Sequence, residues 1–211
     1  MLELKHVGYV AEDDTEILSD VSLSINERFV AITGPNGGGK YTLAKLISGI
    51  YMPTSGQILL DGIDITHMSI TDRANLGVSY AFQQPVRFKG LRVRDLLRLA
   101  AGKDTTLAQA CDYLSEVGLC ARDYIDRELN DSLSGGELKR IEIAMVLARG
   151  TKLSVFEFYD TPISAPRQSK LYSVVKEQEL FSYRSRDFPT FGDIIILFSI
   201  ASQKFIAYGD L

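Results

Sequence analysis

The chain has 211 residues, of which 45% are hydrophobic, and it carries a formal net charge of −4. This length and apolar content suit one well-buried α/β domain and leave little room for two. The basic residues are spread along the chain, so the composition does not indicate a nucleic-acid partner. The N-terminal sequence lacks the features of a signal peptide, and the longest apolar run, 194–201, is too short to span a membrane. We therefore expect a cytoplasmic protein with no direct membrane insertion.

The first predicted elements are two strands, a third strand and a helix. Residues 2–9 and 17–25 alternate apolar and polar with period two, which predicts two half-buried antiparallel strands. Residues 29–33 form an apolar run that stops at a glycine, which is typical of a strand buried on both faces. Leucine and isoleucine then recur at helical spacing over 43–50. A glycine-rich segment joins that strand to that helix, which is the context of a phosphate-binding loop.

The later elements indicate a helical part inserted into a sheet. The pattern predicts strands at 57–60, 77–82 and 153–158, a short helix at 72–76 and a helical stretch over 93–119. We expect the α/β class and one domain over 1–211, with a central, mostly parallel sheet and an N-terminal antiparallel β part. The helical subdomain is predicted at about 85–134.

The phosphate-binding loop is the strongest functional motif. Its glycines let consecutive amide groups converge on a phosphate, and the start of the following helix adds partial positive charge. Lys40 supplies a full charge toward the β and γ phosphates. The nucleotide-binding residues predicted here are Gly34, Pro35, Asn36, Gly37, Gly38, Gly39 and Lys40.

The loop departs from its usual pattern directly after the lysine. That position normally holds Ser or Thr, whose hydroxyl is a ligand of the nucleotide's magnesium, and this chain has Tyr41. The phenol is larger and its oxygen lies too far from the backbone. Thr42 points ~100° further around the helix. Two interpretations stay open: Tyr41 turns away and water completes the Mg2+ shell, or magnesium-dependent chemistry has been lost.

A second motif, Leu133-Ser134-Gly135-Gly136-Glu137, follows downstream. With both motifs, the chain resembles the ATP-binding cassette (ABC) family, whose fold is that of P-loop NTPases. The resemblance implies that Ser134, Gly135 and Gly136 close on the γ phosphate held by a second copy, in a head-to-tail homodimer formed on ATP binding.

The resemblance assigns roles to two further residues. It implies that Tyr9 stacks on adenine, although an ordinary strand aromatic explains Tyr9 equally well. It also implies that Gln83 senses magnesium and couples to the partner protein.

The residues around these motifs narrow the resemblance. Three segments look like the ATPase subunit of the SUF iron-sulfur cluster assembly machinery: 80–85, 126–130 and 134–143. This likeness covers roughly 1–156 and implies an iron-sulfur cluster scaffold protein as partner. A membrane subunit of an ABC transporter is the alternative partner. It is disfavoured because transporter cassettes usually carry glutamines, and no glutamate, in the helix after the signature.

The acidic pair expected after the signature helix is altered. In the family, an aspartate for magnesium is followed by a glutamate that polarises the attacking water. The usual spacing from Ser134 places Glu157 and Phe158 there, and phenylalanine cannot accept a proton. A shifted register would use Asp160, with Thr161 at the general-base position. The candidate metal-side groups are thus Thr42, Gln83 and Glu157, and the candidate catalytic groups are Glu157 and Gln83.

Residues 157–190 are degenerate relative to the family. Ser164 stands where the family has an aspartate, and the C-terminal third holds no histidine, so Tyr183 is the nearest aligned residue to the γ-phosphate histidine. Natural divergence or an error in the sequence would each produce this pattern. Residues 192–210 again resemble the family's final hairpin.

We expect an ABC-type ATP-binding subunit whose cofactors are ATP and Mg2+. It is an ATP hydrolase by resemblance, with hydrolysis impaired by these replacements. The alternative is a nucleotide-binding scaffold that does not hydrolyse ATP.

Overall fold

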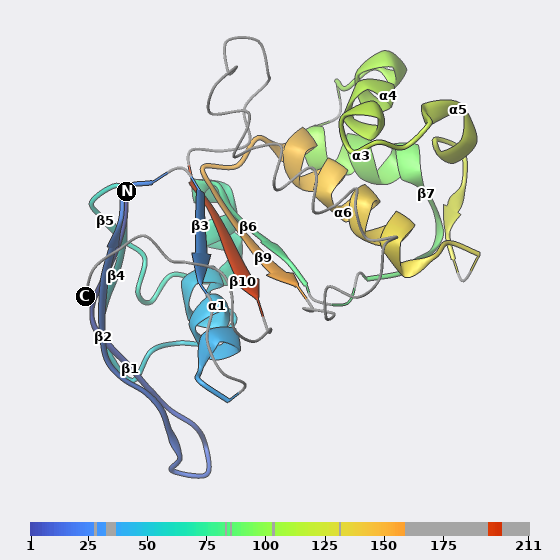
Figure 1. Cartoon of the computed structure of the whole chain (residues 1–211). Coiled ribbons are helices and arrows are strands. Elements are labelled where there is room, and N and C mark those ends of the chain that lie inside the picture. Colours follow the sequence, from blue (N-terminus) through green and yellow to red (C-terminus); the bar gives the residue numbers. More distant parts are fainter. Residues whose placement is uncertain are drawn as a thin grey trace. The chain divides into compact units, whose positions relative to one another are not determined.

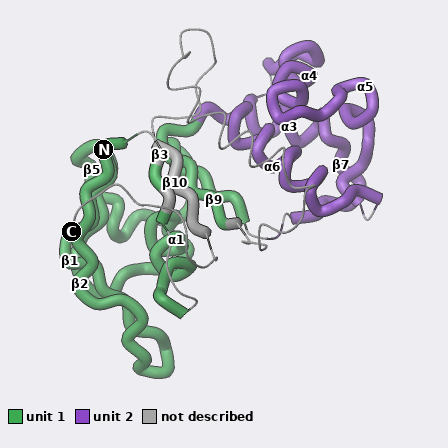
Figure 2. Tube along the Cα trace, in the orientation of Figure 1, with its two compact units in different colours: residues 1–83, 151–160, 192–211 green, residues 84–150, 161–191 purple. Residues whose placement is uncertain are grey.

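The structure is a computed structural model of residues 1–211. It describes residues 1–27, 29–32, 37–82, 84, 86–102, 104–130, 132–158 and 194–199. Two compact units divide the chain, as Figure 2 shows: the first comprises 1–83, 151–160 and 192–211, and the second comprises 84–150 and 161–191.

An antiparallel sheet forms one part of the first unit. Its strands are β1 (Leu2–Val10), β2 (Glu16–Ile25), β4 (Ser55–Leu60) and β5 (Ile63–Asp64), in the order β2-β1-β4-β5. The turn between β4 and β5 uses Asp61 and Gly62, both with left-handed φ, as the hairpin dipeptide Asp-Gly requires. The predicted antiparallel N-terminal part is therefore confirmed.

A parallel sheet forms the other part of the first unit. It contains β3 (Phe29–Ile32), β6 (Val78–Ala81), β9 (Leu153–Phe158) and β10 (Ile194–Ser199), in the order β3-β10-β9-β6. Figure 1 shows β10 between β3 and β9, and it pairs parallel with both. The interpretation of this segment as part of a final hairpin is therefore wrong. Its unbroken apolar run is the pattern of a central parallel strand.

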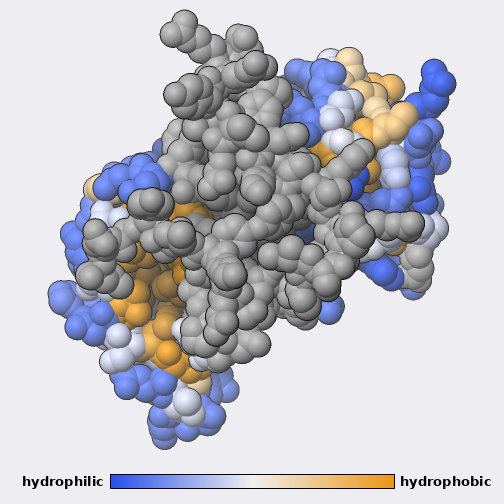
Figure 3. Space-filling model, in the orientation of Figure 1, coloured by the Kyte–Doolittle hydropathy of each residue, from blue (hydrophilic) through white to orange (hydrophobic). Residues whose placement is uncertain are grey.

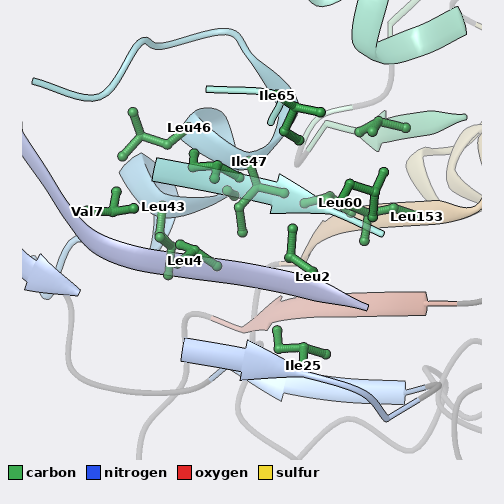
Figure 4. Close-up of a cluster of buried hydrophobic side chains, with 14 of the residues drawn as sticks. Leu2, Leu4, Val7, Ile25, Leu43, Leu46, Ile47, Leu60, Ile65 and Leu153 are labelled. Atoms are coloured by element: carbon green, nitrogen blue, oxygen red, sulfur yellow. The ribbon is translucent and has the colours of Figure 1, made fainter. Parts of the chain in front are cut away.

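Helix α1 (Lys40–Ser48) supplies one wall of the main hydrophobic core. It ends at Gly49, whose φ of 82° is the left-handed value that favours glycine. The helix packs against β2, β6, β9 and β10. Figure 4 shows its apolar residues meeting those of the antiparallel sheet and β9. The labelled core side chains are Leu2, Leu4, Val7, Ile25, Leu43, Leu46, Ile47, Leu60, Ile65 and Leu153.

A buried arginine closes the C-terminal end of α1. Arg73 belongs to α2 (Ile70–Leu76) and is 0% exposed. Its Nη1 donates to the carbonyl oxygens of Leu46 (2.5 Å) and Ile47 (2.9 Å). Its Nη2 donates to the carbonyl oxygen of Thr66 (2.8 Å). Burial lowers the pKa of Arg73 to about 10, so the guanidinium remains charged at neutral pH. It supplies donors to carbonyls in the last turn of α1, where the Leu46 carbonyl also accepts the Gly49 N–H.

The second unit is mostly helical. Its described elements are β7 (Phe88–Arg92), α3 (Val93–Ala101), α4 (Leu107–Glu116), α5 (Ala121–Tyr124), β8 (Glu128–Leu129) and α6 (Gly135–Arg149). Helix α6 packs against α3 and α4, with Leu138 and Ile141 buried. Helix α6 belongs to the second unit, whose first segment runs from Gln84 to Gly150.

The surface view agrees with the charged composition. Figure 3 shows polar and charged residues over most of the described surface on that face. Within the described part of the chain, no helix is long and apolar enough to cross a membrane.

Candidate nucleotide-binding site

The described end of the phosphate-binding loop leads directly into α1. Gly37 and Gly39 have φ values of 81° and 77°, which favour glycine at both positions. At Gly39 a Cβ would also lie 2.5 Å from Leu18 Cδ2 and 3.1 Å from the Ile17 carbonyl oxygen. Lys40 then begins the helix, so the loop has the strand before it and the helix after it that the sequence predicts. Gly34, Pro35 and Asn36 lie outside the described residues.

Tyr41 is held on the exposed side of α1 by the lysine one turn further along. Its side chain is 48% exposed, and the Lys45 Nζ lies 3.9 Å from the centroid of its ring. The same Nζ donates to the Tyr51 hydroxyl at 3.1 Å. Burial acts to lower the pKa of Lys45, but the contacts with Tyr41 and Tyr51 outweigh it and raise that pKa. Lys45 is therefore a cation shared by two phenol rings.

Tyr9 continues this arrangement. Its ring is stacked on Tyr51, with centroids 5.2 Å apart and planes 3° apart, and Lys45 Nζ lies 4.5 Å from the Tyr51 centroid. Tyr9, Tyr51, Lys45 and Tyr41 thus form one series of contacts, here called the aromatic column. One face of Tyr9 is taken by Tyr51, so the stacking on adenine implied by the resemblance would use the other face.

Glu157 lies in β9 and is only 3% exposed. Tyr80 of the neighbouring strand β6 pairs with Val155 in register. The pKa of the Tyr80 phenol is raised, first by burial and then by the Glu157 carboxylate. The phenol therefore stays protonated and gives Glu157 a neutral polar neighbour within the protein. Gln83 lies outside the described residues, and Phe158 is described only as the last residue of β9.

The described residues do not reproduce the magnesium ligands that the resemblance implies. The position of the expected hydroxyl ligand is Tyr41, whose ring contacts Lys45. Thr42 is 7% exposed and lies on the buried side of α1, so it does not take over the direction of residue 41. Nor do the described residues contain a cluster of three or more His, Cys, Asp or Glu side chains that could hold a metal ion.

The signature motif opens helix α6 in the second unit. The Glu137 N–H donates to Ser134 Oγ (3.3 Å), and the Ser134 N–H donates to the Glu137 carboxylate (2.6 Å), which is a capping box. A Cβ at Gly135 or Gly136 would meet nothing within 4 Å, and neither residue has a positive φ. Glycine weakens a helix by up to ~1 kcal/mol relative to alanine. The fold of the chain therefore does not require these two glycines, and they leave open space beside Ser134.

A polar network supports the signature from α5. The Tyr124 hydroxyl donates to Glu137 Oε1, and Arg127 Nη1 lies 3.9 Å from the same oxygen. The pKa of Glu137 is lowered, chiefly by the hydrogen bond from Tyr124 and then by those from Ser134. Glu137 is thus ionised and holds the capping box in place.

The sequence-predicted residues divide between the two units. The first unit holds Tyr9, the described loop residues Gly37 to Thr42, and Glu157, and within it α1 packs against β9. The second unit holds Ser134, Gly135 and Gly136. Four residues near the predicted site residues were not predicted from the sequence: Lys45, Tyr51, Tyr80 and Tyr124. The spacing of four between Tyr41 and Lys45 could have indicated their contact on a helix. Asp160, Thr161, Ser164 and Tyr183 lie outside the described residues.

Known proteins place the chain in a family. The sequence profile described as "ABC transporter" matches residues 18–157, a stretch that includes the phosphate loop and the signature. The chain is 40% identical over 164 residues to "Uncharacterized ABC transporter ATP-binding protein MJ0035" of Methanocaldococcus jannaschii, covering 74% of this chain and 66% of that protein. It is 34% identical over 175 residues to "Probable ATP-dependent transporter ycf16" of Antithamnion sp., covering 76% and 69%. The matches thus span about two thirds of the length of these relatives.

The fold comparison agrees. The dimeric structure of MJ0796, a bacterial ABC transporter cassette, superposes with a TM-score of 0.76 at 21% identity, covering 94% of this chain and 88% of that one. This likeness shows the fold of P-loop ABC cassettes. The chain belongs to the ABC transporter family, as one of its ATP-binding cassettes.

Proposed function

We propose that this chain is an ATP-binding subunit that closes on ATP as a head-to-tail homodimer and acts on a partner protein, with ATP hydrolysis strongly impaired. The observation that carries the proposal is the pairing of two intact elements in one chain. Lys40 starts α1 directly after the glycine loop, and Ser134 with two glycines starts α6. In the proposed dimer, the signature of one copy faces the phosphates held by Lys40 of the other.

The capping box gives Ser134 a chemical role in this dimer. Ser134 Oγ accepts the Glu137 N–H, which leaves its own hydroxyl proton to donate to a phosphate oxygen. The first-turn amides of α6 and the partial positive charge of the helix end favour the same anion. Because Gly135 and Gly136 leave open space, a phosphate can approach these amides closely.

Impaired hydrolysis follows from the chemical positions that have changed. Thr42, Gln83 and Glu157 remain the candidate metal-side groups, and Glu157 and Gln83 the candidate catalytic groups. Phe158 occupies the general-base position and cannot take a proton from water. Loss of a general base typically lowers a rate by ~10² to 10⁴.

The test measures ADP release and sedimentation of the same sample with ATP. We expect an ATP-dependent dimer with ADP production near background, and no ATP response from Lys40→Ala. Ser134→Ala should bind ATP as a monomer. Ser69→Ala is its matched control, because Ser69 caps α2 through the same type of hydrogen bond and lies outside both motifs. Both variants should lose about 1 kcal/mol of stability, but only Ser134→Ala should lose the dimer.

Two partner classes have separate support. The glutamates of the signature helix, Glu137 and Glu142, support an iron-sulfur cluster scaffold protein. The names of the relatives, an ABC transporter ATP-binding protein and an ATP-dependent transporter, support a membrane subunit of a transporter as the partner. A pull-down from separated soluble and membrane fractions decides between them, since a scaffold partner would be recovered from the soluble fraction. A nucleotide-binding scaffold that does no chemistry is the outcome if the dimer forms and no ADP is released under any partner condition.

A further inference from the structure

We propose that Mg2+ does not strengthen nucleotide binding by this chain, because Tyr41 replaces the protein's hydroxyl ligand and is anchored away from the metal position by Lys45. The inference rests on the proposed function, since it concerns the same nucleotide site. It concerns which form of the nucleotide is bound, which the family assignment leaves open.

The Tyr41 side chain is held by a contact with Lys45. Residues 41 and 45 lie one turn apart on the same side of α1, and the 3.9 Å contact joins the Lys45 Nζ to the Tyr41 ring. The phosphate loop precedes α1, so phosphates meet its N-terminal end. The contact holds the Tyr41 ring against the Lys45 ammonium, and Tyr51 contacts the same ammonium.

The other described metal-side candidates, Thr42 and Glu157, do not replace the missing hydroxyl ligand. Thr42 is on the buried side of α1. The Glu157 carboxylate is buried and lies on β9, a different element from the helix that carries residue 41. Neither residue provides a hydroxyl on the exposed side of α1, where residue 41 lies.

The absence of this ligand determines how Mg2+ affects the affinity of the chain for ATP. A metal ion changes the affinity of a nucleotide only if the protein interacts differently with the metal-bound and metal-free forms. Without a protein hydroxyl ligand, the ion keeps its phosphate and water ligands in the free and the bound nucleotide alike. Lys40 and the N-terminal end of α1 attract the phosphates in both forms, and they attract the more negative metal-free form at least as strongly.

The experiment is a calorimetric titration with ATP, once in excess Mg2+ and once in EDTA. The unaltered chain should give dissociation constants that agree within about threefold, or a tighter one in EDTA. Tyr41→Phe keeps the ring over Lys45 and should behave in the same way. Tyr41→Ser supplies the missing ligand and should bind ATP about tenfold more tightly with Mg2+ than without it.

The titrations distinguish a failure of the inference about Mg2+ from a failure of the proposed function. Binding by the unaltered chain that is tenfold tighter with Mg2+ overturns the inference and leaves the proposed function standing. Equal constants for the unaltered chain and for Tyr41→Ser would show that Tyr41 is not the cause, which also overturns it. Absence of ATP binding in both buffers refutes the proposed function itself. Near-ultraviolet circular dichroism of each variant establishes that it is folded.

Discussion

The signature motif and the phosphate-binding part of the candidate site differ in how closely their residues follow the family pattern. On the signature side, Ser134 and Glu137 form a complete capping box around the two glycines, and Tyr124 supports it from outside the motif. On the phosphate side, the glycines and Lys40 are present in the sequence. Tyr41 and Phe158 stand where the proposed function expects the hydroxyl ligand and the general base. The difference separates two tasks that an ABC cassette combines. In the proposed function, the groups that would contact phosphate are retained, and the groups that would activate water or hold the metal have changed.

The largest expected effect contrasts the two arginine networks. Arg73→Met in the first unit removes a fully buried guanidinium and its hydrogen bonds to the carbonyls of Leu46, Ile47 and Thr66. We expect a loss of about 3 kcal/mol or more in the free energy of unfolding, measured by urea denaturation. Arg127→Met in the second unit is the control, because its ion pair with Glu137 is partly exposed and should contribute less than about 1 kcal/mol. Equal losses would show that burial does not distinguish the two networks.

Two glycines should respond to alanine with opposite signs. Gly39→Ala places a Cβ against Leu18 and Ile17 at a left-handed φ, and should cost roughly 2 kcal/mol of stability. Gly135→Ala meets open space in a helix and should raise stability by up to about 1 kcal/mol. Thermal unfolding measures both. Gly135→Ala should nevertheless weaken ATP-dependent dimerisation, and a variant that is more stable and dimerises normally would contradict the role given to the signature.

The smallest expected effect is a change in the pKa of Glu137, which tests whether Tyr124 supports the signature motif. Glu137 has a folded pKa below its ordinary value of 4.5, so its contribution to stability is present above that ordinary value. The contribution disappears as pH falls through the lowered folded pKa. Tyr124→Phe removes the main cause of the shift and should raise the folded pKa of Glu137, so that the contribution is smaller and its loss is complete at a higher pH. An NMR titration of the Glu137 side chain measures this. An unchanged pKa would rule out Tyr124 as the positioning residue.

The spacing of apolar, polar and glycine residues predicts the elements that depend on neighbouring residues in the sequence. The alternation over β1 and β2, the glycine loop before α1 and the capped start of α6 could all be predicted from the sequence. The position of β10 could not, because its apolar run suits a hairpin strand and a central strand alike, and only the pairing with β3 and β9 decides. The packing of α6 on α3 and α4 is a tertiary property.

The site shows the same division. The loop residues and the signature follow from spacing, and the replacement at Tyr41 is evident from the sequence. The direction of the Tyr41 side chain depends on Lys45, which in turn depends on Tyr51, a residue beyond the end of the helix. Tyr80 reaches Glu157 only through the pairing of β6 with β9. Such contacts between separate elements leave no periodic signal in the sequence.

The central claim is that this cassette binds ATP and closes on it without completing the chemistry. The most direct test measures ADP formation over time in a sample whose ATP-dependent dimer has been established by sedimentation. The unaltered chain is compared with the double variant Tyr41→Ser, Phe158→Glu. The account predicts a dimer that releases ADP near background, and a higher rate in the double variant. Rapid magnesium-dependent ADP release by the unaltered chain, abolished by Lys40→Ala, would contradict it.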